Sequence, residues 1–96
     1  MTLPRIMDIL AACQPLAQSR YHARLKGVFG STVRATPEEP NDIDILVEFD
    51  EQADLLDWVG LAQYLEERLH CQVDLVPIRS LRAELKDRIL AETVYL

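Results

Sequence analysis

The sequence lacks a hydrophobic run of membrane-spanning length and contains few cysteines. None of its hydrophobic runs approaches the roughly 18 residues that a transmembrane helix needs, and Asp8 and Pro15 interrupt the N-terminal segment too early for a signal peptide. Cys13 and Cys71 lie far apart without CxxC spacing, so the sequence indicates neither a zinc site nor a redox motif. We therefore expect no contact with membranes, and reduced thiols in a cytoplasmic protein.

Basic residues are also scarce. The chain has ten Lys or Arg against sixteen Asp or Glu, and its formal net charge is −6. Nonspecific binding of nucleic acid depends on basic side chains that neutralise phosphates, so this composition argues against it. The length of 96 residues, 49% of them hydrophobic, predicts one globular domain spanning 1–96.

The acidic residues are concentrated in one stretch. Residues 38–57 contain nine acids and no base, whereas residues 1–37 contain five bases and one acid. Such a run is most often the solvated surface of a loop. It is also compatible with a cation site, because clustered carboxylates attract Mg²⁺ or Ca²⁺.

The order of the expected elements indicates an α+β fold with a short mixed sheet and flanking helices. Thr2 and Pro4 suit a helix start, and Pro15 is expected to end or kink that helix, with a second helical piece running to about Arg24. Residue patterns predict strands at 25–29, 43–49 and 72–76, and helices at about 55–69 and 80–91. Residues 94–96 are expected to add an edge strand or to dock on a partner.

The spacing of apolar residues in the two later helices predicts their inward faces. The expected inward residues are Leu55, Trp58, Ala62, Leu65 and Leu69 in the first helix, and Leu81, Leu85 and Ile89 in the second. Asp54 and Ser80 are the expected N-caps. Glu84 and Arg88 are expected to form an exposed pair four residues apart.

Three acidic residues on two expected strands are candidate metal ligands. Asp42 and Asp44 are two residues apart where the strongest strand starts, so both side chains point to one face, about 6–7 Å apart at their roots. Asp74 lies in the middle of the strand QVDLV. If the two strands are neighbours, Asp74 joins the pair on one patch that could hold one or two divalent ions.

A second candidate element follows the first strand. Gly30 allows a close backbone approach, and Ser31 could open a helical turn at 32–35 whose N–H groups face phosphate. Arg34 has a charge suited to phosphate oxygens, although pairing with Glu38 or Glu39 is an equally good interpretation. Taken alone, Gly-Ser is more often only a turn with an N-cap.

Residues 30–49, GSTVRATPEEPNDIDILVEF, resemble the signature of the minimal nucleotidyltransferase (MNT) family in the polymerase-β superfamily. The shared features are the Gly-Ser, an arginine three residues after the serine, a loop with prolines, and Asp-Ile-Asp leading into an apolar strand. VDLVP at 73–77 and the C-terminal residues 81–96 resemble further parts of the family, so the likeness covers nearly the whole chain. Ala35 replaces a usual glycine and Asn41 a usual serine; neither change removes a carboxylate.

The resemblance implies a Mg²⁺-dependent nucleotidyltransferase with a polymerase-β-like core. Asp42, Asp44 and Asp74 would be catalytic residues that hold two Mg²⁺ ions, and Gly30, Ser31 and Arg34 would bind the triphosphate of ATP. The chemistry would move a nucleoside monophosphate to an acceptor hydroxyl and release pyrophosphate.

The small size of the chain implies a partner, because larger relatives use additional domains to bind the acceptor. In the MNT family the usual partner is a helical HEPN toxin, which the transferase neutralises as its antitoxin by adenylylating a tyrosine, so a hetero-oligomer is expected. Two alternatives remain open. One is an antitoxin that binds its partner without catalysis, and the other is a nucleotidyltransferase that acts on a small molecule or an RNA end.

Overall fold

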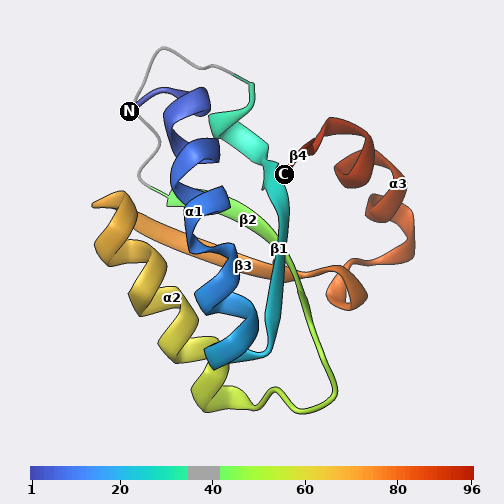
Figure 1. Cartoon of the computed structure of the whole chain (residues 1–96). Coiled ribbons are helices and arrows are strands. Elements are labelled where there is room, and N and C mark those ends of the chain that lie inside the picture. The colour runs from blue at the N-terminus through green and yellow to red at the C-terminus, as the bar shows by residue number, and fades with distance from the viewer. Residues whose placement is uncertain (35–41) are drawn as a thin grey trace.

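The computed structural model describes residues 1–34 and 42–96, which form a mixed four-stranded sheet with three α-helices (Figure 1). The elements in chain order are α1 (Leu3–Tyr21), β1 (Ala23–Phe29), η1 (Gly30–Thr32), β2 (Asp42–Phe49), α2 (Leu55–Leu69), β3 (Gln72–Pro77), η2 (Ile78–Ser80), α3 (Ala83–Glu92) and β4 (Val94–Tyr95). The predicted α+β class and mixed sheet are confirmed. None of the helices in these two described ranges is long and apolar enough to span a bilayer.

The first helix continues through Pro15 to Tyr21, so the predicted end at the proline and the separate second helical piece are wrong. Proline removes one backbone hydrogen bond from a helix interior and can cost about 3 kcal/mol. Here Pro15 is exposed, while the buried side of the helix continues from Leu10, before the proline, to Ala17, after it. The side chain of Gln14 also exchanges two hydrogen bonds with the backbone of Leu25, at 2.7 and 2.8 Å, which ties this turn to β1. Packing and these bonds therefore outweigh the local preference of proline.

The strand order is β3-β2-β1-β4, with β2 parallel to β3 and antiparallel to β1. The two strands that carry the acids are therefore neighbours, as the sequence interpretation required. The C-terminal residues form the predicted edge strand, since β4 pairs with β1 through Val94 and Tyr95. The N–H of Leu96 also donates to the carbonyl of Lys26 at 2.9 Å.

Helices α1 and α2 cover one face of the sheet, and the core lies between these helices and the strands (Figure 1). Asp54 caps α2 as predicted, because its carboxylate accepts a hydrogen bond from the N–H of Asp57. The carboxylate of Asp57 in turn accepts one from the N–H of Asp54, so the two residues form a capping box. The first turn of α2 departs from the predicted face, because Leu55 is 73% exposed and Trp58 lies only partly covered against Phe49. The residues of α2 that are buried are Leu61, Leu65 and Leu69.

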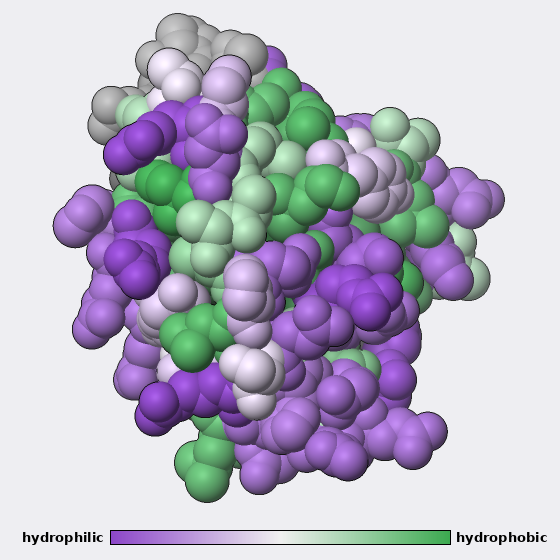
Figure 2. Space-filling view, in the orientation of Figure 1, coloured by the Kyte–Doolittle hydropathy of each residue, from purple (hydrophilic) through white to green (hydrophobic). Residues whose placement is uncertain are grey.

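The C-terminal helix differs most from its prediction. It starts at Ala83 after a short 3₁₀ turn at Ile78–Ser80, so Ser80 is not its N-cap. No residue of α3 is buried, and Leu85 is 40% exposed. Figure 1 shows α3 beside β4, away from α1 and α2, and hydrophobic surface remains in this part of the molecule in Figure 2. Glu84 lies 3.8 Å from Arg82, on the N-terminal side of the helix, instead of forming the predicted pair with Arg88.

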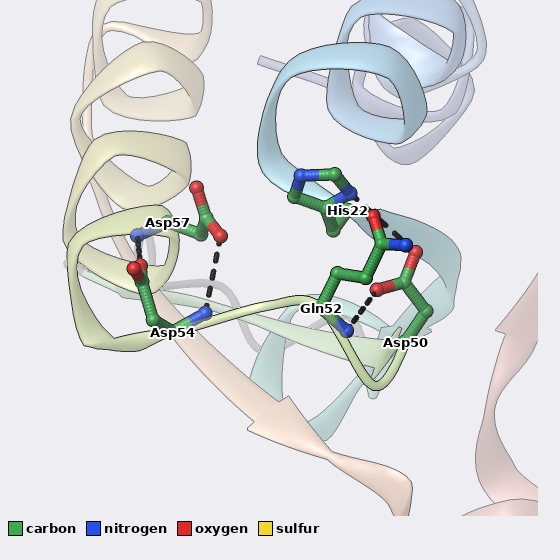
Figure 3. A network of polar contacts seen from close by, with 5 residues as sticks. All are labelled: His22, Asp50, Gln52, Asp54 and Asp57. Carbon is green, nitrogen blue, oxygen red and sulfur yellow. Dashed lines mark hydrogen bonds and ion pairs between the residues drawn. The ribbon is translucent and has the colours of Figure 1, made fainter.

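The connection from β2 to α2 is held by a polar network (Figure 3). Asp50 accepts a hydrogen bond from the N–H of Gln52 at 2.8 Å, and its carboxylate lies 3.6 Å from Nδ1 of His22. His22 ends α1 in the left-handed region with φ of 54°. Its carbonyl accepts a bond from the N–H of Asp50 at 2.9 Å. The network thus joins the C-terminal end of α1 to that of β2.

Candidate functional site

The candidate site starts where β1 ends, at Gly30. This residue has φ of +82°, which side chains other than glycine rarely adopt. A Cβ atom at this position would collide with the carboxylate of Asp44, so the absence of a side chain lets the backbone approach that carboxylate directly. The glycine is therefore required both by the turn and by its neighbour on β2.

The sheet register brings the candidate acids together. Asp44 is paired with Phe29 at the end of β1 on one side and with Asp74 of β3 on the other. Adjacent strands lie about 4.8 Å apart, so Asp44 and Asp74 are cross-strand neighbours on the same face. Asp42 is two residues earlier on β2 and shares that face. Because the alternate residues Ile45 and Leu75 belong to the core under α1 and α2, the acids lie on the opposite face of the sheet.

Like charges and burial act on Asp44 together. Burial raises the pKa of the Asp44 carboxyl, and the charges of Asp74 and Asp42 raise it further. The positive charge of Arg34 opposes this rise in the pKa of Asp44, and the negative charge of Glu92 adds to it. A partly buried carboxylate among other carboxylates creates a negative potential that favours a bound cation.

Of the helical turn predicted at 32–35, the structure describes residues 32–34, and these residues are not in an α-helix. Gly30–Thr32 form a 3₁₀ turn, in which the N–H groups of Val33 and Arg34 both point to the carbonyl of Gly30 at 3.1 Å. Ser31 lies in this turn, directly beside Gly30 and the acids. The Thr32 hydroxyl oxygen is buried, and it has no hydrogen-bond partner among the described residues. The turn therefore places Ser31 next to Gly30, which itself lies against the carboxylate of Asp44.

Arg34 has a partner that the sequence interpretation missed. Its Nη1 lies 3.5 Å from Oε1 of Glu92, at the end of α3. The proposed alternative partners Glu38 and Glu39 lie outside the described residues, as do the departures Ala35 and Asn41. No local sequence signal points to Glu92, because the pairing joins positions 58 residues apart in the chain.

The donor set of the site suits Mg²⁺, since Asp42, Asp44 and Asp74 offer only carboxylate oxygens. In residues 1–34 and 42–96, no three carboxylate, thiol or imidazole side chains gather closely enough to hold one ion. The fold thus brings together the strands that carry the acids, while the side chains do not form a completed cage. The metal-binding roles of the three aspartates stay predictions.

A separate cavity of about 620 Å³ lies at the other end of β2. Its lining includes Phe49, Trp58 and Ile78, and the three candidate acids are not part of that lining. The hollow and the acidic face are therefore different features.

Comparison with a family model agrees with this geometry. The model of the polymerase beta nucleotidyltransferase family matches residues 12–96 of the chain. Among curated proteins, the protein adenylyltransferase MntA of Thermococcus cleftensis is 42% identical over 95 residues, covering 99% of this chain and 96% of the relative.

Solved structures have the same fold. A protein provisionally described as a minimal nucleotidyltransferase matches with a TM-score of 0.76 and 35% identity, over 100% of this chain and 97% of that one. A chain from the complex of the tri-AMPylated Shewanella oneidensis HEPN toxin with MNT antitoxin matches with a TM-score of 0.57 and 27% identity, over 96% of this chain and 66% of that one. Both likenesses extend over nearly the whole chain, including β1, β2 and β3.

Proposed function

Because the chain belongs to the polymerase beta nucleotidyltransferase family, we propose that it transfers AMP from ATP, with Mg²⁺ bound, to a tyrosine hydroxyl of a HEPN-type toxin. Such a transfer makes this chain the antitoxin of the pair. The observation that carries the proposal is the position of Asp44, which lies between Asp74 on β3 and the turn at Gly30.

The reaction moves one adenylyl group, the AMP portion of ATP. The acceptor oxygen forms a bond to the α-phosphorus, the bond from that phosphorus to the bridging oxygen of pyrophosphate breaks, and the hydroxyl proton leaves for a base. Asp42, Asp44 and Asp74 would hold two Mg²⁺ ions, which when bound neutralise charge on the attacking and leaving oxygens. Asp74 is exposed on the open face of the sheet, so it is accessible to an acceptor that approaches that face.

The turn after β1 is suited to bind the triphosphate. Gly30 exposes backbone beside Asp44, and Ser31 adds a hydroxyl group at the same place. The guanidinium of Arg34 supplies positive charge to phosphate oxygens. We therefore assign Gly30, Ser31 and Arg34 to nucleotide binding.

A second protein is expected to complete the site. The described part of this 96-residue chain consists of one sheet with three α-helices, which leaves little structure to hold an acceptor. The MntA relative is a protein adenylyltransferase, and a structural neighbour occurs with an AMPylated HEPN toxin. These likenesses support a HEPN partner in a hetero-oligomer. Since transfer consumes ATP, we expect the pair to act in the cytoplasm.

The test combines this chain, its HEPN partner, ATP and Mg²⁺, and measures the mass of the partner by mass spectrometry. We expect a gain of one or more AMP groups at tyrosine, and none without Mg²⁺ or with the double variant Asp42→Asn and Asp44→Asn. The matched control Glu48→Gln neutralises an exposed acid at the other end of β2 and should keep transfer.

Three results would contradict the proposal. An adduct that persists in the double variant would remove the two aspartates from the chemistry. Rescue of cells from the toxin by that variant would favour an antitoxin that acts by binding alone. Transfer of label from ATP without a protein acceptor would favour a small molecule or an RNA end as the substrate.

A further inference from the structure

Arg34 and Glu92 form an ion pair between segments that are distant in the sequence. Nη1 of Arg34 lies 3.5 Å from Oε1 of Glu92, and the side chains are 56% and 26% exposed. Arg34 follows the 3₁₀ turn after β1, whereas Glu92 is the last residue of α3. Glu92 is the less exposed partner, so it is the better fixed of the two.

The backbone around Glu92 is anchored to the sheet. The next residue, Thr93, is buried, and its hydroxyl donates to the carbonyl of Ile89 at 2.7 Å. Val94 is then paired with Val28 in the contact of β4 with β1. Because β1 leads directly into Gly30, the same strand positions both the turn before Arg34 and the segment after Glu92.

Both side chains lie close to the acidic site. Gly30 lies against the carboxylate of Asp44, the N–H of Arg34 donates to the carbonyl of Gly30 at 3.1 Å, and Glu92 reaches the guanidinium of Arg34. Surface ion pairs contribute little to folding stability, usually less than about 1 kcal/mol. The pair is therefore better explained by its effect on the position of the Arg34 guanidinium than by a contribution to folding stability.

We propose that Glu92 is a positioning residue that holds the guanidinium of Arg34 beside Asp44, ready to contact the triphosphate of ATP. The inference rests on the nucleotide-binding role proposed for Arg34 above. An unrestrained arginine that is more than half exposed must be ordered when the nucleotide binds, at a cost of about 0.5–1.5 kcal/mol. Glu92 removes part of that cost by ordering the side chain in advance.

The test measures the Kd of ATP with Mg²⁺ by isothermal titration calorimetry on the purified chain. Glu92→Ala should weaken binding roughly 2- to 10-fold, the range that corresponds to the ordering cost. Glu92→Gln keeps an oxygen acceptor without the charge and should give an intermediate loss. The matched control Glu84→Ala changes an exposed glutamate on the same helix and should leave Kd unchanged.

A double-mutant cycle separates positioning from a structural role. If Glu92 acts through Arg34, adding Glu92→Ala to Arg34→Ala should cause no further loss of affinity, whereas a general disturbance of α3 would add its own loss. An additive loss, an unchanged Kd in Glu92→Ala, or no ATP binding by the unsubstituted chain would each overturn the inference. ATP binding needs no protein acceptor, so this result is independent of whether AMP is transferred to a HEPN toxin.

Discussion

The substitution Gly30→Ala tests whether the site depends on the close approach between the β1 turn and Asp44. The new side chain meets two obstacles. The backbone at this position has φ of +82°, and the added Cβ would overlap Oδ2 of Asp44. The first obstacle strains the backbone at position 30, and the second displaces the side chain of Asp44, a candidate catalytic residue.

The two effects have different sizes and different readouts. A residue with a Cβ in the left-handed region costs about 1–2 kcal/mol, which lowers the melting temperature of a domain this size by about 4–16 °C. The overlap involves the end of a side chain, so Asp44 can rotate away at little further cost in stability. That rotation displaces the carboxylate, and a misplacement of about 1 Å at a reacting centre can lower the rate about 100-fold. We therefore expect a moderate loss of stability and a severe loss of AMP transfer.

The assay compares transfer to the partner with thermal unfolding of the same preparations, at a temperature where both proteins are folded. Gly60→Ala is the matched control, because Gly60 lies within α2, where its added Cβ would meet the ring of Tyr21 and not the acids. This control should keep transfer close to that of the unsubstituted chain. If Gly30→Ala also keeps half or more of the activity, the contact between the turn and Asp44 is not needed for the reaction.

Two further predictions concern the turn of α1 that contacts β1. Gln14→Ala removes both hydrogen bonds to the Leu25 backbone and leaves partly buried groups without partners, so urea unfolding should show a loss of about 2–4 kcal/mol; a loss below about 0.5 kcal/mol would contradict it. Pro15→Ala restores a backbone donor on the exposed side of the helix and should stabilise the fold by about 1–2 kcal/mol, after allowance for the greater freedom of the unfolded chain. An unchanged or lower urea midpoint would show that the helix accommodates the proline without strain.

Local sequence patterns were sufficient for the parts of the fold that depend on near neighbours. The N-cap at Asp54 was predicted from its place just before the helix, and the strand that starts at Asp42 and Asp44 was predicted from its period of two. The neighbouring position of Asp74 followed from the strand pattern together with the family resemblance. The pairing of Asp44 with Asp74 is confirmed, whereas the roles of these acids in metal binding and catalysis stay predictions.

The features that the sequence did not predict depend on contacts between distant segments. The helix persists through Pro15 because Gln14 and the buried side of the helix attach it to β1, and neither contact is visible in the local pattern. The apolar spacing of α3 predicted that one side of the helix would be buried. In the structure α3 has no buried residue, because periodicity shows which side is apolar but not whether another element packs against it. The pairing of Arg34 with Glu92 likewise depends on β4 joining β1.

The acidic surplus in residues 38–57 divides between two tasks at opposite ends of β2. At the start of the strand, Asp44 lies against Asp74 with its pKa raised by burial and like charges, an arrangement that costs stability unless a cation binds. Beyond the other end of β2, the carboxylate of Asp50 accepts a hydrogen bond from the N–H of Gln52, and that of Asp54 accepts one from the N–H of Asp57 (Figure 3). These bonds stabilise the connection to α2 and its first turn. Asp50 and Asp54 thus support the structure, whereas Asp42 and Asp44 accept no hydrogen bond from the residues that the structure describes. That difference favours the start of β2 as the place of the proposed cation site, although the composition alone spreads the acids along the whole strand.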